Sequence, residues 1–281
     1  MHIAVTGGTG YIGHSLVEFL ANLGHKITVI SRSDKKQNKR SLSGDISYLK
    51  LDIFSYDNID MYDKLGRPDI LIHLAWESGF SHNEPSHVNN VIKHLNFIET
   101  MLKGGLKHLA VTGTMHEIGY FVGEVDENTP TNPQHLYGIA KNFLRQTTEI
   151  LCKKYSAIYQ WIRVFYIHGG DINNNSIFSK ILRASQANNN SFELNSGELL
   201  YDFIHINELV KQISSVVEQD VINGIINCCS GEPVSLKTMV NNFIRDNNLS
   251  IKIEYDKFPI RSYDSRAIWG SNKKINLICQ Q

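Results

Sequence analysis

The 281-residue sequence has few cysteines and no long hydrophobic run. Its four cysteines are Cys152, the adjacent Cys228 and Cys229, and Cys279, and their spacing fits neither a zinc site nor a disulfide ladder. No apolar run approaches the length of a membrane span, and residues 2–6 begin a strand pattern without the basic flank and cleavage site of a signal peptide. We therefore expect reduced thiols and a cytoplasmic location.

The sequence also lacks an excess of charge of either sign. It has 28 basic and 28 acidic residues, so its formal net charge at pH 7 is zero. A balanced chain has no global field that would draw it to nucleic acid or to an anionic membrane. We expect neither partner, and an anionic substrate must be held by local groups.

Short β-branched runs alternate with helical patterns over the first part of the chain. The strand-like runs are residues 3–5, 27–30, 70–74, 109–112 and 161–165. This alternation predicts an α/β protein with a doubly wound parallel sheet, the Rossmann arrangement. After Gly169 the pattern loosens into Asn-rich stretches around residues 173–175 and 188–190, followed by a strand-like run at 200–206. We predict an NAD(P)-binding domain over residues 1–169 and a smaller, mainly substrate-binding region over 170–281, interleaved with the first.

A glycine-rich run follows the first predicted strand and opens a helix predicted over residues 11–23. Gly7 permits a tight turn, Gly10 lets the backbone approach a pyrophosphate, and Gly13 packs the helix on the strand. The run is also compatible with a flexible turn, but its position between strand and helix predicts a dinucleotide site. The predicted contacts in this loop are Gly7, Thr9, Gly10, Tyr11, Ile12 and Gly13.

The end of the second strand carries Ser31 and Arg32 in place of a carboxylate. A carboxylate at this point bonds the ribose 2′-hydroxyl of NAD, whereas a nearby arginine accommodates the 2′-phosphate of NADP. We therefore predict that NADP(H) is favoured over NAD(H), although Arg32 is also compatible with an ordinary basic loop. Asp52, followed by Ile53, stands after the third strand, where it can receive the adenine amino group or cap a helix.

Tyr137 and Lys141 lie four residues apart at the start of a predicted helix, hence on one face. A free phenol has a pKa of about 10, and a nearby ammonium lowers it toward the range useful for proton exchange. Upstream, residues 111–119 end a strand and offer the hydroxyls of Thr112 and Thr114 to orient a carbonyl. The arrangement predicts a tyrosine acid/base supported by a lysine and a threonine.

Taken together, these segments resemble the extended short-chain dehydrogenase/reductases, the family of NAD-dependent epimerases and dehydratases. The resemblance covers nearly the whole chain and rests on the order and spacing of the glycine loop, Asp52, residues 72–75, 112–119, Tyr137 with Lys141, 163–169, 201–206 and 227–235. It implies a Rossmann domain, a small substrate domain, a homodimer formed through a helix pair, and a nucleoside-diphosphate sugar as substrate.

The resemblance also assigns roles to single residues. Thr114 matches the catalytic hydroxyl, with Thr112 as the alternative, while Tyr137 matches the acid/base and Lys141 its partner, which also holds the nicotinamide ribose. The residues that would contact the nicotinamide end of the cofactor are Leu74, Ala75, Trp76, Tyr137, Lys141, Phe165 and Ile167. The expected substrate contacts are Ser78, His116, Glu117, Tyr166, Tyr201 and Arg261. His116 is also compatible with a structural loop histidine and Arg261 with a surface residue, and no metal ligand is expected.

Departures from the family pattern narrow the reaction. Met115 and His116 replace the Asp-Glu pair that the sugar dehydratases place after the threonine, so a dehydratase is disfavoured. Ser31 and Arg32 fit an exchangeable NADPH, which favours net reduction. We expect NADPH-dependent reduction of a nucleoside-diphosphate 4-keto-6-deoxyhexose at C4, in deoxysugar and surface-polysaccharide biosynthesis, with dTDP as the candidate nucleotide. The alternatives are a sugar-nucleotide epimerase with tightly bound NAD and a non-catalytic NADP-sensing regulatory protein.

Overall fold

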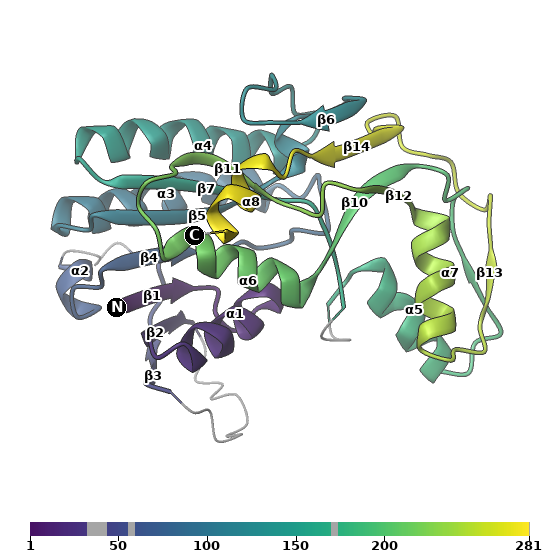
Figure 1. Cartoon of the computed structure of the whole chain (residues 1–281), viewed down its shortest axis with the longest axis horizontal. Helices are drawn as coiled ribbons and strands as arrows, with labels where there is room; N and C mark the ends of the chain where they lie inside the picture. Colours follow the sequence, from purple (N-terminus) through teal and green to yellow (C-terminus); the bar gives the residue numbers. More distant parts are fainter. Residues whose placement is uncertain (33–43, 56–59, 170–173, 281) are drawn as a thin grey trace.

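A seven-stranded parallel sheet forms the centre of the computed structural model (Figure 1), which describes residues 1–32, 44–55, 60–169 and 174–280. The strand order is β11-β7-β5-β4-β1-β2-β3, and every neighbouring pair is parallel. The strands are β1 (His2–Thr6), β2 (Lys26–Ser31), β3 (Ile46–Lys50), β4 (Ile70–His73), β5 (His108–Thr114), β7 (Ile158–Val164) and β11 (Gly224–Cys228). The doubly wound α/β fold predicted from the sequence is thus confirmed.

Helices cover both faces of this sheet, which is why its central strands are apolar on both sides. On one face α1 packs against α6, and α6 against α8. On the other face α3 packs against α4 and α2. The helices are α1 (Tyr11–Asn22), α2 (Met61–Lys64), α3 (Ser86–Gly104), α4 (Leu136–Lys154), α6 (Ile206–Val217) and α8 (Lys273–Cys279). Of the helices described, none combines the length and the hydrophobicity that crossing a membrane requires.

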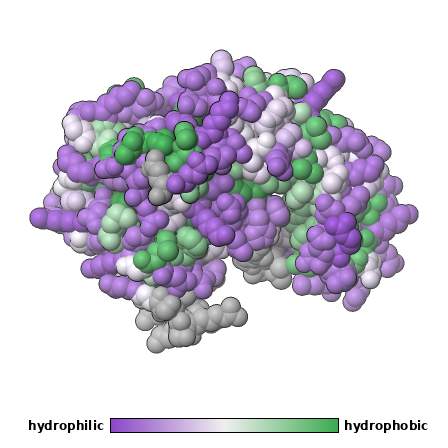
Figure 2. Space-filling view, in the orientation of Figure 1, coloured by the Kyte–Doolittle hydropathy of each residue, from purple (hydrophilic) through white to green (hydrophobic). Residues whose placement is uncertain are grey.

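A smaller lobe lies at one end of the molecule, to the right in Figure 1. Its parts are β8 (Tyr166–His168), α5 (Ile177–Gln186), β9 (Ser191–Glu193), β10 (Leu200–His205), β12 (Pro233–Ser235), α7 (Leu236–Asp246), β13 (Lys252–Glu254) and β14 (Ala267–Gly270). A separate apolar cluster, which includes Phe178, Phe203 and Val240, holds it together. Figure 2 shows an indented outline between this lobe and the main body.

The two predicted regions exchange segments. β11 and α6 follow residue 170 in sequence yet complete the large sheet and its helical cover, whereas β6 (Gly123–Val125) leaves the first region to pair with β14. The predicted boundary itself touches residues 170–173, which lie outside the described part of the chain. The division into residues 1–169 and 170–281 stays a proposal, with β11 and α6 returning to the first region.

Candidate active site

The glycine loop between β1 and α1 has the shape that a dinucleotide requires. Gly7 has a φ of 71°, and a Cβ there would lie 2.7 Å from the backbone nitrogen of Ala75. A Cβ on Gly13 would collide with the carbonyl oxygen of Gly7. Gly10 caps α1 without a side chain, so the first N–H groups of the helix remain available to an anion. The residues present therefore fit the pyrophosphate of a nicotinamide dinucleotide.

The other predicted cofactor residues in this region fall into two groups. Thr9 and Asp52 are exposed, whereas Ile53 is buried and Ile12 packs against the core. Asp52 accepts a hydrogen bond from the backbone N–H of Phe54 at 3.0 Å. Since β3 ends at Lys50 and α2 begins only at Met61, Asp52 lies in the turn that follows β3 and does not cap that helix.

Three side chains with complementary chemistry meet beyond the end of β5. Thr114 is the last residue of β5, and Tyr137 and Lys141 lie on the first two turns of α4. The Thr114 side chain lies close enough to the phenol of Tyr137 to lower its pKa through a hydrogen-bonding interaction. The Thr112 hydroxyl instead donates to the carbonyl of His73 at 3.3 Å within the sheet. Of the two candidate hydroxyls, the structure brings Thr114 to the tyrosine.

Burial dominates the titration of this group. It raises the pKa of Tyr137 to about 12, and the hydrogen bond with Thr114 offsets only part of that rise. It also lowers the pKa of Lys141 to about 7, although the negative charge of Glu117 opposes the shift. Besides burial, the groups that shift the pKa of this phenol are Thr114 and Glu117, and the lowering of that pKa by Lys141 stays a prediction. Tyr137 is a protonated phenol at neutral pH and can donate a proton.

Trp76 is held beside Lys141 by two histidines. The Lys141 Nζ lies 4.1 Å from the centroid of the indole and donates to the carbonyl of Thr112 at 2.8 Å. The indole stacks on His94 with centroids 4.7 Å apart, and its Nε1 donates to Nδ1 of His87 at 2.9 Å. These contacts fix Trp76 at the carboxyl end of β4, where the sequence predicts the nicotinamide site.

The remaining residues of the predicted nicotinamide lining differ in their access. Leu74, Ala75 and Ile167 are half-buried, whereas Phe165 is buried against Gly270, where a Cβ would lie 2.7 Å from the phenyl ring. Phe165 therefore offers little surface to a cofactor.

Glu117 does not face the substrate. Its side chain is 0% exposed, so the prediction that it contacts the sugar is wrong. One carboxylate oxygen accepts from the backbone N–H of Thr114 at 2.7 Å and from Nε1 of Trp161 at 2.9 Å. The other oxygen accepts from Arg163 at 3.4 Å. Glu117 instead fixes the backbone that carries Thr114, a role that is visible only once its burial is known.

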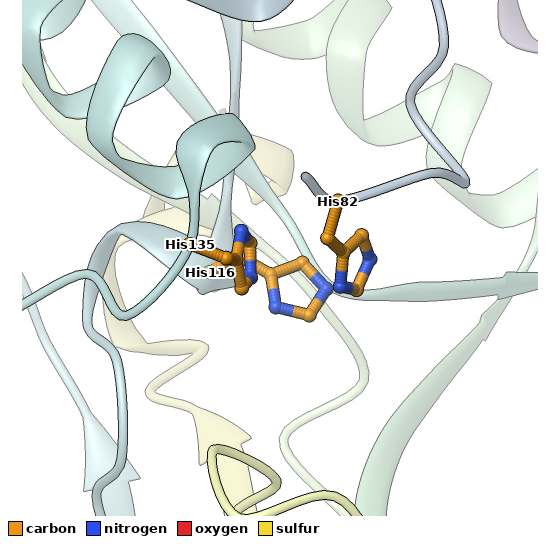
Figure 3. Close-up of side chains that lie close together, drawn as sticks. All are labelled: His82, His116 and His135. Carbon is orange, nitrogen blue, oxygen red and sulfur yellow. The ribbon is translucent and has the colours of Figure 1, made fainter. Parts of the chain in front are cut away.

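Three histidines gather in one cluster (Figure 3), and the centroid of each ring lies 6.0–6.2 Å from that of Tyr137. His82 comes from the loop before α3, His116 from the 3₁₀ turn η1 (Met115–Glu117), and His135 from the N-cap of α4. Each offers a ligand atom within 4.8 Å of the others. His135 was not predicted as a site residue, and its position two residues before Tyr137, at the start of the helix, was the signal that could have found it. Mutual proximity, the charge of Arg261 and above all burial lower the pKa of these rings, to about 4 for His82.

The same histidines are poorly arranged for a metal. Nδ1 of His135 accepts the backbone N–H of Gly138 at 3.1 Å, so the neutral ring carries its proton on Nε2. A metal would have to displace either this proton or the helix cap. Neutral imidazoles offer both donors and acceptors, which suits the hydroxyl groups of a sugar.

Aromatic side chains complete the sugar side of the site. Tyr166 lines a small cavity together with His116, His135 and Tyr263. Tyr201 lies behind Tyr166, with ring centroids 4.3 Å apart, and is 6% exposed. Arg261 is exposed, stacks over the ring of Tyr263 and pairs with Asp264 at 3.0 Å. Ser78 is exposed in the loop after β4, with a φ of 57°.

The glycine loop and the Thr114, Tyr137 and Lys141 group together define a Rossmann-fold enzyme of the extended short-chain dehydrogenase/reductase type. The model of the NAD-dependent epimerase/dehydratase family matches residues 3–229. This chain belongs to that family.

Among individual relatives, the chain is 46% identical to a dTDP-6-deoxy-L-talose 4-dehydrogenase (NAD(+)) of Aggregatibacter actinomycetemcomitans, over 96% of this chain and 100% of the relative. Among solved structures, it resembles a UDP-N-acetylglucosamine 4-epimerase of Methanobrevibacter ruminantium in complex with UDP-N-acetylmuramic acid, with a TM-score of 0.85, 21% identity and coverage of 99% and 91% of the two chains. It also resembles the UDP-glucose 4-epimerase of Thermus thermophilus in complex with NAD, with a TM-score of 0.81, 16% identity and coverage of 99% and 92%. Both structural likenesses support the fold.

The prediction that NADP(H) is favoured over NAD(H) is wrong. The relative at 46% identity is named as NAD(+)-dependent. The prediction relied on Arg32 as a phosphate receptor. In the structure, Arg32 forms an ion pair with the carboxylate of Glu77 from the loop after β4. A guanidinium already paired with a carboxylate is a poor receptor for a phosphate.

Proposed function

We propose that this chain is an NAD(H)-dependent oxidoreductase that interconverts the C4 hydroxyl and the C4 carbonyl of a dTDP-linked 6-deoxyhexose. The hydroxyl form we propose is dTDP-6-deoxy-L-talose. The observation that carries the proposal is the meeting of Thr114, Tyr137 and Lys141 beside the glycine loop, in a chain 46% identical to a dehydrogenase of that sugar nucleotide. The proposed product belongs to deoxysugar and surface-polysaccharide biosynthesis.

The bound nicotinamide would supply or accept the hydride at C4. The glycine loop and the N-terminus of α1 would hold its pyrophosphate, and Trp76 and Lys141 would flank its nicotinamide end. On reduction, Tyr137 Oη donates a proton to the C4 oxygen, and on oxidation it removes that proton. Thr114, hydrogen-bonded to Tyr137, orients the C4 oxygen and stabilises charge that develops on it.

The sugar side supports a neutral, hydroxyl-rich ligand. We propose that His116 and Tyr166 contact the hexose, because both line the cavity next to Tyr137. Ser78, exposed in the loop after β4, stays a proposed sugar contact on the family resemblance alone. Arg261 is the positive group on this side and would meet the diphosphate, after exchanging part of its contact with Asp264. Tyr201 would act through Tyr166, since that ring covers it.

The test is a spectrophotometric assay of nicotinamide reduction with purified protein, NAD⁺ and dTDP-6-deoxy-L-talose. We expect free NADH to accumulate with the wild type and not with Tyr137→Phe. An epimerase would change the sugar without net NADH, and a cofactor-sensing regulatory protein would change neither. Either result would reject the dehydrogenase proposal.

We further propose a homodimer formed through α3 and α4. Exposed apolar side chains follow one another at intervals of about one turn on both helices, namely Val88 and Ile92 on α3 and Ile139 and Phe143 on α4. A face of this kind on a paired helix surface suits a second copy of the chain. Light scattering should give twice the chain mass, and Ile92→Glu together with Phe143→Glu should give the chain mass. We also propose that the protein is located in the cytoplasm.

A further inference from the structure

The coenzyme preference of this chain needs a negative group, and the described residues at the end of β2, Ser31 and Arg32, do not supply one. NAD-preferring enzymes of this fold place a carboxylate at the end of the second strand to bond the ribose 2′-hydroxyl. Here that strand ends in Ser31 and is followed by Arg32. We propose that Glu77, from the loop after β4, supplies this carboxylate and is the residue that selects NAD(H) over NADP(H). The inference rests on the NAD(H) dependence proposed above.

The sheet order brings Glu77 to the required place. β2 and β4 are the two neighbours of β1, so their carboxyl ends flank the glycine loop that follows β1. Arg32 stands one residue beyond the end of β2, and Glu77 four residues beyond the end of β4. Their ion pair therefore joins the two sides of the cofactor crevice at the carboxyl edge of the sheet, where dinucleotides bind in this fold.

The carboxylate of Glu77 is anchored independently of Arg32. Its second oxygen accepts a hydrogen bond from Nδ2 of Asn90 on α3 at 3.0 Å. The side chain of Glu77 is 37% exposed and that of Arg32 is 62% exposed, so a ligand can reach both. An anchored carboxylate keeps its charge at the crevice even when a ligand displaces the arginine.

The two coenzymes meet this pair differently. The 2′-hydroxyl of NAD is a hydrogen-bond donor that a carboxylate can accept. The 2′-phosphate of NADP carries negative charge, so it would have to take Arg32 from Glu77 and then lie beside the remaining carboxylate. An exposed ion pair contributes little to folding stability, but here it changes the relative affinity for a coenzyme with a neutral 2′-hydroxyl and one with a charged 2′-phosphate.

The experiment measures binding of NADH and of NADPH separately by nicotinamide fluorescence titration of the full-length protein without any sugar. Glu77→Gln removes the charge and keeps the shape. We expect it to improve the affinity for NADPH relative to NADH at least tenfold over the wild-type ratio. Adding Arg32→Ala to Glu77→Gln should remove that gain, because the freed guanidinium is what receives the phosphate.

Glu84→Gln is the matched control, because Glu84 is an exposed glutamate later in the same loop. It removes the same charge and should leave the ratio unchanged. A Glu77→Gln protein whose ratio stays within twofold of the wild type would overturn the inference, as would a gain that survives Arg32→Ala. A wild type that binds NADPH more tightly than NADH would overturn the NAD(H) assignment as well, whereas failure to oxidise the sugar with intact selectivity would reject only the proposed reaction.

Discussion

The cofactor side and the sugar side of the active site differ in whether backbone or side chains form them. The cofactor side consists mainly of backbone: a glycine loop, the N-terminus of α1 and the ends of apolar strands. The sugar side consists of side chains, chiefly the three clustered histidines and the tyrosines around them. A backbone site recognises what all dinucleotides share, whereas a side-chain site can be altered residue by residue. Substitutions on the sugar side should therefore change the reaction and leave cofactor binding intact.

The largest expected effect tests this separation at Tyr137. Tyr137→Phe removes the proton donor and keeps the ring, so kcat should fall by about 10² to 10⁴-fold, the contribution of a general acid. The dissociation constant for NADH should stay within twofold of the wild-type value. Turnover assays and a fluorescence titration on the same preparation check both expectations. Loss of NADH binding would mean that the two sides are not separable at this residue.

The second prediction concerns the buried carboxylate of Glu117, which holds the backbone of Thr114 and the side chain of Arg163 beneath the active site. Glu117→Gln leaves Arg163 as an uncompensated buried charge, which should reduce the free energy of unfolding by about 3–5 kcal/mol. Urea denaturation followed by circular dichroism measures this loss. Glu149→Gln is the control, since Glu149 forms only a surface pair with Lys153 and its loss should cost less than about 1 kcal/mol. Equal losses in the free energy of unfolding for Glu117→Gln and Glu149→Gln would refute the proposal that the buried Glu117 carboxylate stabilises the fold.

The pH dependence of the two directions should differ. Because burial raises the pKa of Tyr137 to about 12, the phenolate is a small fraction at neutral pH. Below the pKa of an acid that fraction rises about tenfold for each pH unit, so kcat/KM for oxidation of the alcohol should rise steeply with pH. For reduction it should stay flat over the same range, because the phenol remains protonated. Initial rates in both directions measure this. A plateau in the oxidation profile near neutral pH would show that the phenol ionises much earlier.

The smallest expected effect concerns His116. His116→Gln keeps a polar side chain but changes its reach, so KM for the sugar nucleotide should rise by about tenfold, the cost of one hydrogen bond. The dissociation constant for NADH should not change. His25→Gln is the control, because His25 precedes β2 at the opposite edge of the sheet and pairs with Glu218. Equal steady-state constants for wild type and His116→Gln would remove His116 from the sugar site.

The sequence predicted those features that depend on local pattern. The glycine loop and the strands β1, β2, β4, β5, β7 and β10 match runs that the sequence pattern predicts. β11 was missed because a five-residue strand after an irregular stretch carries no sign of the sheet it joins. The role of Glu117 depends on its burial, and the pairing of Arg32 with Glu77 joins residues 45 positions apart. The fold determines contacts of this kind between distant residues, so the local sequence pattern does not predict them.

The most direct test of the account follows the hydrogen at C4. dTDP-6-deoxy-L-talose carrying deuterium at C4 is mixed with NAD⁺ and the wild-type protein, and both products are analysed by mass spectrometry. The account predicts free, deuterated NADH and an equal amount of 4-keto sugar nucleotide. Deuterium retained at C4 of a new sugar epimer, without free NADH, would contradict it.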